Sequence, residues 1–284
     1  MPHARNEQTD ALLDKEFPAL DHGFVRLVDY MGSDSAIVQA ARVSYGEGTK
    51  KVSEDRALIR YLMRHRHTSP FEMVELKFHV KLPIFVARQW IRHRTASVNE
   101  YSGRYSIMKD EFYVPEPKDI RYQSAVNKQG RADEEVPPEV KQKLVEYLQK
   151  SQSYSYEQYK QFVDEGLARE LARINLPLSL YTEWYWKIDL HNLFHFLRLR
   201  LDPHAQYEIR EYAKVVGDIV KVVCPVAYEA FEDYSLNALT LSSPEVNVLR
   251  EHLKGIVQTI DDLVKRGFSK REAEEFLEKF AKFR

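Results

Sequence analysis

The sequence of 284 residues contains one cysteine, Cys224. A single cysteine can form neither an intrachain disulfide nor a metal site built from several cysteines. No excess of one charge is present, because 42 basic and 43 acidic residues give a net charge of −1, whereas nucleic-acid-binding proteins are usually broadly basic. No uninterrupted apolar run approaches the ~20 residues of a membrane span, and the charged N-terminal segment lacks the apolar centre of a secretory signal. We therefore expect a cytoplasmic protein that binds neither membranes nor nucleic acid.

The apolar residues that are present follow two periodicities. Alternation of apolar and polar residues predicts strands at 24–28, 76–82, 112–114 and 178–188. Helical spacing predicts helices at 33–41 and in the segments that follow Ser53, Pro83, Pro138, Asp189 and Pro203. We expect residues 118–137 to form a polar surface loop. Because strands and helices do not alternate regularly, we predict an α+β fold with a mixed or antiparallel sheet flanked by long helices.

The two ends of the chain differ in pattern from its centre. Residues 1–20 are predicted to be a loosely held N-terminal arm, and residues 21–235 to be the catalytic domain. Residues 236–284 are predicted to be a helical C-terminal extension. Its first helix should run from Val246 to Val264 and end before Gly267, and Ser269 with Glu272 predicts a capping box for a last helix.

The segment Arg92–Arg104 (RHRTASVNEYSGR) is the strongest indication of function. It contains three arginines, and Glu100 is its one acidic residue. Arginine presents five donors in a planar fork that suits phosphate and other groups rich in acceptors. A strongly cationic segment in a nearly neutral chain indicates a bound anion rather than general affinity for polyanions. Arg88 and Arg92, at positions i and i+4 of the helix that begins after Pro83, are expected to share one helical face.

The segment resembles RHRxxSxNExSxR, the signature of flavin-dependent thymidylate synthases, at all eight fixed positions. The resemblance covers roughly residues 22–234. Four other segments within it also resemble this family: HRHTSPFE, PIFVARQW, LARINLPLSLYTEWYW and LRLRLDPHAQYEIR. The resemblance implies the fold of that family. It also implies conversion of dUMP to dTMP, with 5,10-methylenetetrahydrofolate as carbon donor and NADPH as reductant through FAD. Family members are homotetramers, so we expect active sites built from several subunits.

The resemblance also implies roles for individual residues. Those expected to bind dUMP are Gln89, Arg92, Glu100, Ser102, Gly103, Arg104, Arg173 and Arg200. Arg200 is the expected catalytic residue, because a cation at the uracil edge would stabilise negative charge that develops during the reaction. Those expected to bind FAD are Ser69, Arg92, His93, Arg94, Thr95, Glu100, Asp189, His191 and His195. His67 and Asn99 are expected in the flavin and folate neighbourhood. Asp189, His191 and His195 depart from the asparagine, arginine and asparagine of many relatives.

Several residues allow a second interpretation. The histidines His65, His67, His79, His93, His191 and His195 allow a metal site, but no HExxH is present, and we predict no metal. Cys224 precedes a proline at an apolar helix end, which favours a structural thiol over a nucleophile. Ser102 precedes Gly103 and Arg104, which favours phosphate binding over nucleophilic attack.

Two further groups leave alternatives open. In the aromatic run, Trp184 and Trp186 are expected in the core, whereas Tyr181, Tyr185 or both either pack or face a ligand. Arg198, Arg200, His204 and Gln206 form either a solvated helix end or a second half of the site. Three functional classes therefore remain: a flavin enzyme, a non-redox transferase or hydrolase acting on a nucleotide phosphate, and a nucleic-acid-binding module. The chain lacks a P-loop and a GxGxxG motif, which fits binding of FAD by arginines.

Overall fold

The computed structural model describes residues 6–43, 55–125, 130–253 and 258–281. The chain divides into two compact units, Met1–Leu236 and Asn237–Arg284. This division falls one residue from the predicted start of the extension. Ser53, the predicted helix cap, lies outside the described residues.

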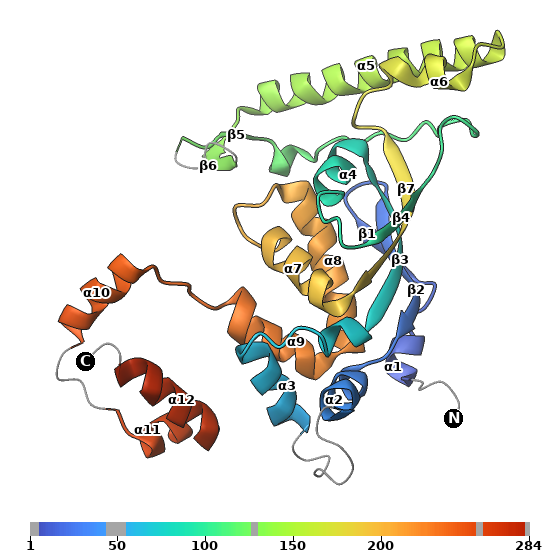
Figure 1. Ribbon diagram of the computed structural model, residues 1–284. Coiled ribbons are helices and arrows are strands. Elements are labelled where there is room, and N and C mark those ends of the chain that lie inside the picture. Colours follow the sequence, from blue (N-terminus) through green and yellow to red (C-terminus); the bar gives the residue numbers. More distant parts are fainter. Residues whose placement is uncertain (1–5, 44–54, 126–129, 254–257, 282–284) are drawn as a thin grey trace. The chain divides into compact units, whose positions relative to one another are not determined.

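A five-stranded antiparallel sheet forms the centre of the first unit (Figure 1). Its strands, in spatial order, are β1 (Glu16–Ala19), β2 (Gly23–Met31), β3 (Glu75–Pro83), β7 (Tyr181–Asp189) and β4 (Ser97–Glu100). All four pairings are antiparallel. The fold class predicted from the sequence is therefore confirmed.

The alternating residues of β3 and β7 separate the two faces of this sheet. Leu76, Phe78 and Val80 are fully buried on one face, as are Trp184 and Trp186 across from them. The prediction that both tryptophans belong to the core is therefore confirmed. The opposite face carries polar residues in alternation, so the sheet has one face in the core and one polar face.

Helices close the core on the apolar face of the sheet (Figure 1). They are α2 (Asp34–Val43), α3 (Asp55–Arg64), α4 (Ile84–Trp90), α7 (Leu190–Arg200), α8 (Tyr207–Val223) and α9 (Pro225–Phe231). Trp90 joins α4 to this core, because its ring lies 5.1 Å from that of Trp186 and 4.6 Å from that of Phe196. Cys224 is fully buried between α8 and α9, which confirms its prediction as a buried structural cysteine.

The remaining short elements of the first unit lie along its loops. They are α1 (Glu7–Asp10), η2 (Phe71–Met73), η3 (Pro117–Asp119), α6 (Arg169–Ala172), η4 (Arg173–Asn175) and the π-helix η5 (Glu232–Leu236). No helix in the described ranges is both long and apolar enough to cross a membrane.

The longest helix of the described residues is α5 (Pro138–Asp164), which lies along one side of the first unit (Figure 1). Pro138 occupies its first turn, where a missing N–H has no consequence. The predicted amphipathic helix is confirmed, but its apolar side chains are largely solvent-exposed: Val140, Leu144, Tyr147, Tyr154 and Phe162. We call these five residues the α5 stripe. Exposed apolar and aromatic side chains that share one face of a long surface helix are typical of a protein–protein contact.

The second unit is helical, as predicted. It contains α10 (Ser243–His252), α11 (Ile260–Lys265) and α12 (Lys270–Ala281). The prediction of one helix from Val246 to Val264 is wrong, because α10 and α11 are separate. Gly267 has φ +95° directly after α11, and Ser269 and Glu272 form the predicted capping box.

Four other predictions made from periodicity require correction. Residues 118–137 are not a simple loop, because β5 (Arg121–Gln123) pairs with β6 (Arg131–Glu135). The predicted strand at 112–114 is reduced to one bridge between Phe112 and Leu180. The strand predicted at 178–188 begins at residue 181, and Leu178 is exposed. The described part of the expected N-terminal arm is ordered, since residues 16–19 form the edge strand β1.

Candidate active site

The first half of the signature is the turn that follows α4. The helix ends at Trp90, and the backbone N–H of His93 donates to the carbonyl of Trp90 at 3.0 Å. The prediction that Arg88 and Arg92 share one helical face is therefore wrong. Within the described part of the chain, the guanidinium groups of Arg92 and Arg94 have no hydrogen-bonding or ion-pair partner. Both are exposed, so this turn presents free guanidinium groups to an anion.

Arg200, at the end of α7, is joined to this turn. Its Nε donates to Nε2 of His93 at 3.0 Å, and its Nη2 donates to the backbone carbonyl of Gln89 at 3.4 Å. Burial of His93, together with the nearby Arg200 and His195, lowers the pKa of His93 to about 4. His93 is therefore neutral near pH 7 and can accept from Arg200. The structure thus brings together Gln89, His93 and Arg200, three residues predicted for the site.

The other predicted flavin residues lie on α7 and near its start. The ring of His195 lies 5.8 Å from that of His93. Asp189 caps α7, since its Oδ1 accepts from the Asn192 backbone N–H at 2.9 Å and its Oδ2 accepts from Nδ2 of Asn192 at 2.7 Å. The carboxylate at 189 therefore orders the helix start, which is also where His191 lies.

The second half of the signature begins with the edge strand β4. All four of its residues, including Asn99, are exposed in the single chain. Glu100 is held in place by Thr182, whose hydroxyl donates to Oε1 of Glu100 at 2.9 Å. The chain then turns at Ser102, whose Oγ accepts from the backbone N–H of Arg104 at 3.3 Å.

Gly103 and Arg173 lie in direct proximity. A Cβ at position 103 would lie 3.0 Å from Nη1 of Arg173 and 2.8 Å from Sδ of Met108. A side chain at position 103 would therefore require the side chains of Arg173 and Met108 to shift. Arg104 forms an exposed ion pair with Glu170, Nε to Oε2 2.9 Å. Exposed pairs contribute about 0–1 kcal/mol, so this pairing leaves Arg104 available to another anion. Arg104 and Arg173 thus place two cations around the Ser-Gly-Arg turn.

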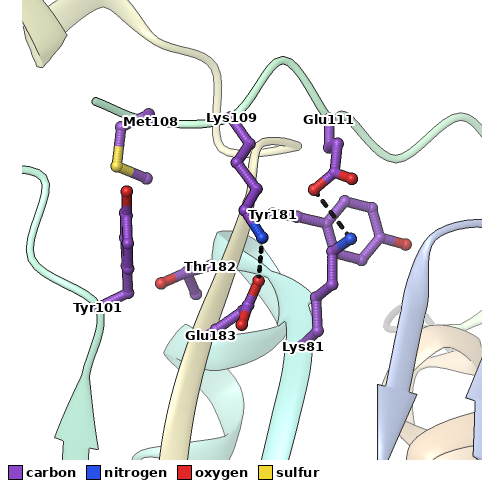
Figure 2. A pocket seen from close by; sticks show the side chains of 8 residues that line it. All are labelled: Lys81, Tyr101, Met108, Lys109, Glu111, Tyr181, Thr182 and Glu183. Atoms are coloured by element: carbon purple, nitrogen blue, oxygen red, sulfur yellow. Dashed lines mark hydrogen bonds and ion pairs between the residues drawn. The ribbon is translucent and has the colours of Figure 1, made fainter. Parts of the chain in front are cut away.

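A pocket lies next to Thr182, the residue that donates to Glu100 (Figure 2). It is lined by Lys81, Tyr101, Met108, Lys109, Glu111, Tyr181, Thr182 and Glu183. Lys109 pairs with Glu183 at 2.9 Å and Lys81 pairs with Glu111 at 2.8 Å. Because its charges neutralise one another, this pocket is less suited to an anion than the free guanidinium groups of the signature.

The two tyrosines of β7 differ in environment. Tyr181 is buried and its hydroxyl donates to Asp21, Oη to Oδ1 2.5 Å. Tyr185 is 42% exposed and its ring stacks on that of His79 at 5.0 Å. Of the two, only Tyr185 remains open to a ligand.

The loop before η2 carries two of the predicted residues. Arg66 has φ +57°, a left-handed conformation that is uncommon for a residue with a side chain. It precedes His67, whose backbone N–H donates to the carbonyl of Leu62 at 2.9 Å. His67 and Ser69 are both exposed, so this loop presents polar side chains at the surface.

Sequence reasoning missed a buried acidic residue next to the site. Glu208 is 2% exposed at the start of α8. It accepts from the Tyr113 hydroxyl at 3.1 Å, from Nε2 of Gln206 at 2.8 Å and from Arg131. In the cluster around Pro203, Gln206 joins this network, whereas Arg198 and His204 are exposed. No periodic signal marks Glu208, because its burial depends on the hairpin that carries Arg131.

The chain is similar to known proteins over most of its length. The sequence profile of the family described as "Thymidylate synthase complementing protein" matches residues 26–226. A flavin-dependent thymidylate synthase from Treponema denticola is 62% identical over 243 residues, covering 86% of this chain and 91% of the relative. One from Rickettsia prowazekii is 54% identical over 283 residues and covers 95% of both chains.

The chain belongs to the flavin-dependent thymidylate synthase family. A solved structure is also similar, a UMP/dUMP methylase from Streptomyces cacaoi bound with 5-Br UMP, at 36% identity and a TM-score of 0.69. It covers 78% of this chain and 98% of that structure. The family profile ends at residue 226, so the helical extension lies beyond it.

Proposed function

We propose that this protein is a flavin-dependent thymidylate synthase that converts dUMP to dTMP. The proposal includes 5,10-methylenetetrahydrofolate as carbon donor and NADPH as reductant. The observation that carries it is the pairing of Arg200 with a neutral His93 inside the cationic signature segment. Full-length relatives that carry the name of this activity support the substrate assignment.

In this proposal Arg200 stabilises charge on the uracil ring. Its guanidinium is half-buried, and burial lowers its pKa from the ordinary value without removing its charge at neutral pH. His93 and the Gln89 carbonyl fix its orientation before substrate arrives. A preoriented cation in a partly desolvated site strongly favours negative charge that develops on the N3–C4–O4 side of the ring.

The second half of the signature would hold the phosphate of dUMP. Ser102 supplies a hydroxyl, Gly103 permits close approach, and Arg104 and Arg173 supply charge. Glu100, fixed by Thr182, would accept from a donor of the same nucleotide. Gln89 and Arg92 complete the proposed dUMP set.

The residues present also fit a flavin. Two free guanidinium groups at Arg92 and Arg94 are the donors that a pyrophosphate requires. We assign FAD to the segment around them, namely Ser69, Arg92, His93, Arg94, Thr95, Glu100, Asp189, His191 and His195. The chemistry that the flavin supplies when bound is reduction of the transferred group. The side chains of this segment bind and orient, and His67 and Asn99 would lie next to the flavin and folate.

We propose that the protein acts as a homotetramer. The edge strand β4 is exposed along its whole length in one chain, although it carries Asn99 and Glu100. The α5 stripe is a second uncovered surface. Both would be covered if a further copy of the chain completed the site. Substituting Leu144 in the stripe by Asp should reduce the assembly size in sedimentation, and a fully active monomer of the wild-type protein would contradict the proposal.

Flavin content and product formation test the function. The purified protein should be yellow, or become so with FAD, and should form dTMP from dUMP only when folate and NADPH are both supplied. A colourless protein that binds dUMP without flavin would instead support a non-redox transferase or hydrolase. A protein that does not bind dUMP would exclude both the flavin enzyme and the non-redox transferase or hydrolase.

A further inference from the structure

Glu208, Gln206 and Gln89 form a chain of side-chain hydrogen bonds that leads from a buried carboxylate to the proposed site. Nε2 of Gln206 donates to Oε2 of Glu208 at 2.8 Å. Nε2 of Gln89 in turn donates to Oε1 of Gln206. Gln89 lies in the last turn of α4, whereas Gln206 and Glu208 lie at the start of α8. This series of hydrogen bonds therefore connects α4 to the start of α8.

Glu208 determines which groups donate and which accept along this series of hydrogen bonds. A carboxylate can only accept hydrogen bonds, whereas an amide presents an acceptor on one side and two donors on the other. Gln206 must therefore turn its Nε2 toward Glu208. Its Oε1 then faces Gln89, which must turn its own Nε2 toward Gln206.

Gln89 is consequently fixed with its carbonyl oxygen outward. Within the described ranges of the chain, its Oε1 has no hydrogen-bonding partner. The backbone carbonyl of the same residue accepts from Arg200 at 3.4 Å. The residue that carries the free oxygen is thus bonded through its backbone to Arg200, the residue that is proposed to contact the uracil ring.

Other contacts hold Glu208 independently of this chain. Arg131 pairs with Oε1, and the Tyr113 hydroxyl donates to the same oxygen at 3.1 Å. The carboxylate is 2% exposed and lies in the first turn of α8, where negative charge is stabilised. Oε1 is thus committed to Arg131 and Tyr113, and Oε2 is committed to Gln206.

We propose that Glu208 is a positioning residue that fixes the side-chain amide of Gln89 through Gln206, so that Gln89 accepts a hydrogen bond from the substrate. This inference rests on the proposed function, in which Gln89 contacts dUMP. The recognised group is a donor, either the ring N3–H or the sugar hydroxyl of the nucleotide. Neither Gln206 nor Glu208 touches the substrate in this proposal.

Substitution of Glu208 by Gln should reverse the roles of donor and acceptor along this series of hydrogen bonds. The amide oxygen can remain opposite Arg131 and Tyr113, so the new Nε2 faces Gln206. Gln206 then turns its oxygen toward position 208 and its Nε2 toward Gln89, which turns its own Nε2 outward. Two donors would then face each other at the substrate. Because each of these donors would then lack an acceptor, we expect the Kd of dUMP to rise about tenfold in E208Q.

A second substitution tests whether E208Q acts through the direction of these hydrogen bonds or through general destabilisation of the site. In Gln89→Glu alone, the carboxylate faces Oε1 of Gln206, so two acceptors oppose each other and dUMP binding weakens. In the double variant Q89E/E208Q, the reversed Gln206 donates to the new carboxylate, whose other oxygen accepts from dUMP. The double variant should bind dUMP at least about fivefold more tightly than Q89E. A merely structural role of Glu208 predicts the opposite, because two damaging changes would then weaken binding further.

Tyr113→Phe is the matched control, since it removes a donor from the same carboxylate but leaves the bond to Gln206. Its melting temperature should fall while its Kd for dUMP stays within about twofold of wild type. N3-methyl-dUMP and 2′,3′-dideoxyuridine monophosphate distinguish the two donors, because the analogue that lacks the recognised donor should bind wild type and E208Q equally. If both analogues keep the full dependence on Glu208, the inference is overturned.

The inference and the proposed function can fail separately. Wild-type protein that does not bind dUMP in calorimetry removes both. Wild-type binding with an unchanged Kd in folded E208Q, or a double variant weaker than Q89E, removes the inference and leaves the function intact. Unchanged binding in Gln89→Ala would also remove it, because Gln89 would then not contact the nucleotide.

Discussion

Replacement of Arg200 by Lys tests how the site controls charge on the substrate. Arg200 donates through Nε to His93 at 3.0 Å and through Nη2 to the Gln89 carbonyl at 3.4 Å. A lysine keeps a charge but concentrates it at one ammonium group, so it cannot hold both acceptors and present a planar edge to the ring. The 3.0 Å bond from a charged donor contributes about 1.5–3 kcal/mol. Loss of this bond in R200K should raise the free energy of the transition state by the same amount.

This loss corresponds to a fall in kcat of about ten- to 150-fold. The Kd of dUMP should change by less than about threefold, because the phosphate contacts of the second signature half are untouched. Initial rates of dTMP formation and calorimetric binding of dUMP measure the two quantities. Arg198→Lys is the matched control, since Arg198 lies on the same helix and is exposed. A kcat within twofold of wild type in R200K, or equal losses in kcat and binding, would refute the reasoning.

Three further predictions concern single residues. Gly103→Ala should weaken dUMP at least about fivefold in calorimetry, because its Cβ would displace Arg173, lying 3.0 Å from Nη1. His93 should titrate near pH 4 by NMR. Its folded pKa lies below the ordinary 6.5, so its contribution to stability should be present above about pH 6.5 and lost as the pH falls toward 4; denaturation curves of wild type and His93→Gln should converge there. Cys224→Ser should keep most activity but unfold more easily, because burial raises the pKa of this thiol and a buried hydroxyl there costs about 1–3 kcal/mol.

The elements predicted correctly are those whose burial repeats along the sequence. β3 alternates between fully buried and partly exposed residues, and α8 buries one side over 17 residues. The missed elements lack such a repeat. β1 contains Pro18 in a strand of four residues, and β5 and β6 expose most of their side chains. Their pairing depends on contacts made by the rest of the chain, which periodicity cannot report.

The candidate site also has a part that the sequence predicts and a part that it does not. The local density of cations in the signature is visible in the sequence, and it marks the segment in which the guanidinium groups of Arg92 and Arg94 lack partners among the described residues. The partners of that segment were not visible, because His93 and Arg200 are 107 residues apart and Gln89 and Gln206 are 117 apart. The resemblance to a family supplied Arg200 and Arg173. It did not supply Glu208, whose role depends on a hydrogen-bond direction that only coordinates reveal.

The side chain and the backbone of Gln89 connect it to two different polar groups. Its backbone carbonyl accepts from Arg200, whereas its side-chain amide is oriented by Glu208 through Gln206. A side-chain substitution at position 89 leaves the backbone acceptor in place, so Arg200 should keep its orientation in Gln89→Ala. Loss of dUMP affinity in that variant should therefore occur with little change in kcat at saturating dUMP. Arg200→Lys should show the reverse, and this opposite pair of effects separates recognition of the nucleotide from stabilisation of charge on its ring.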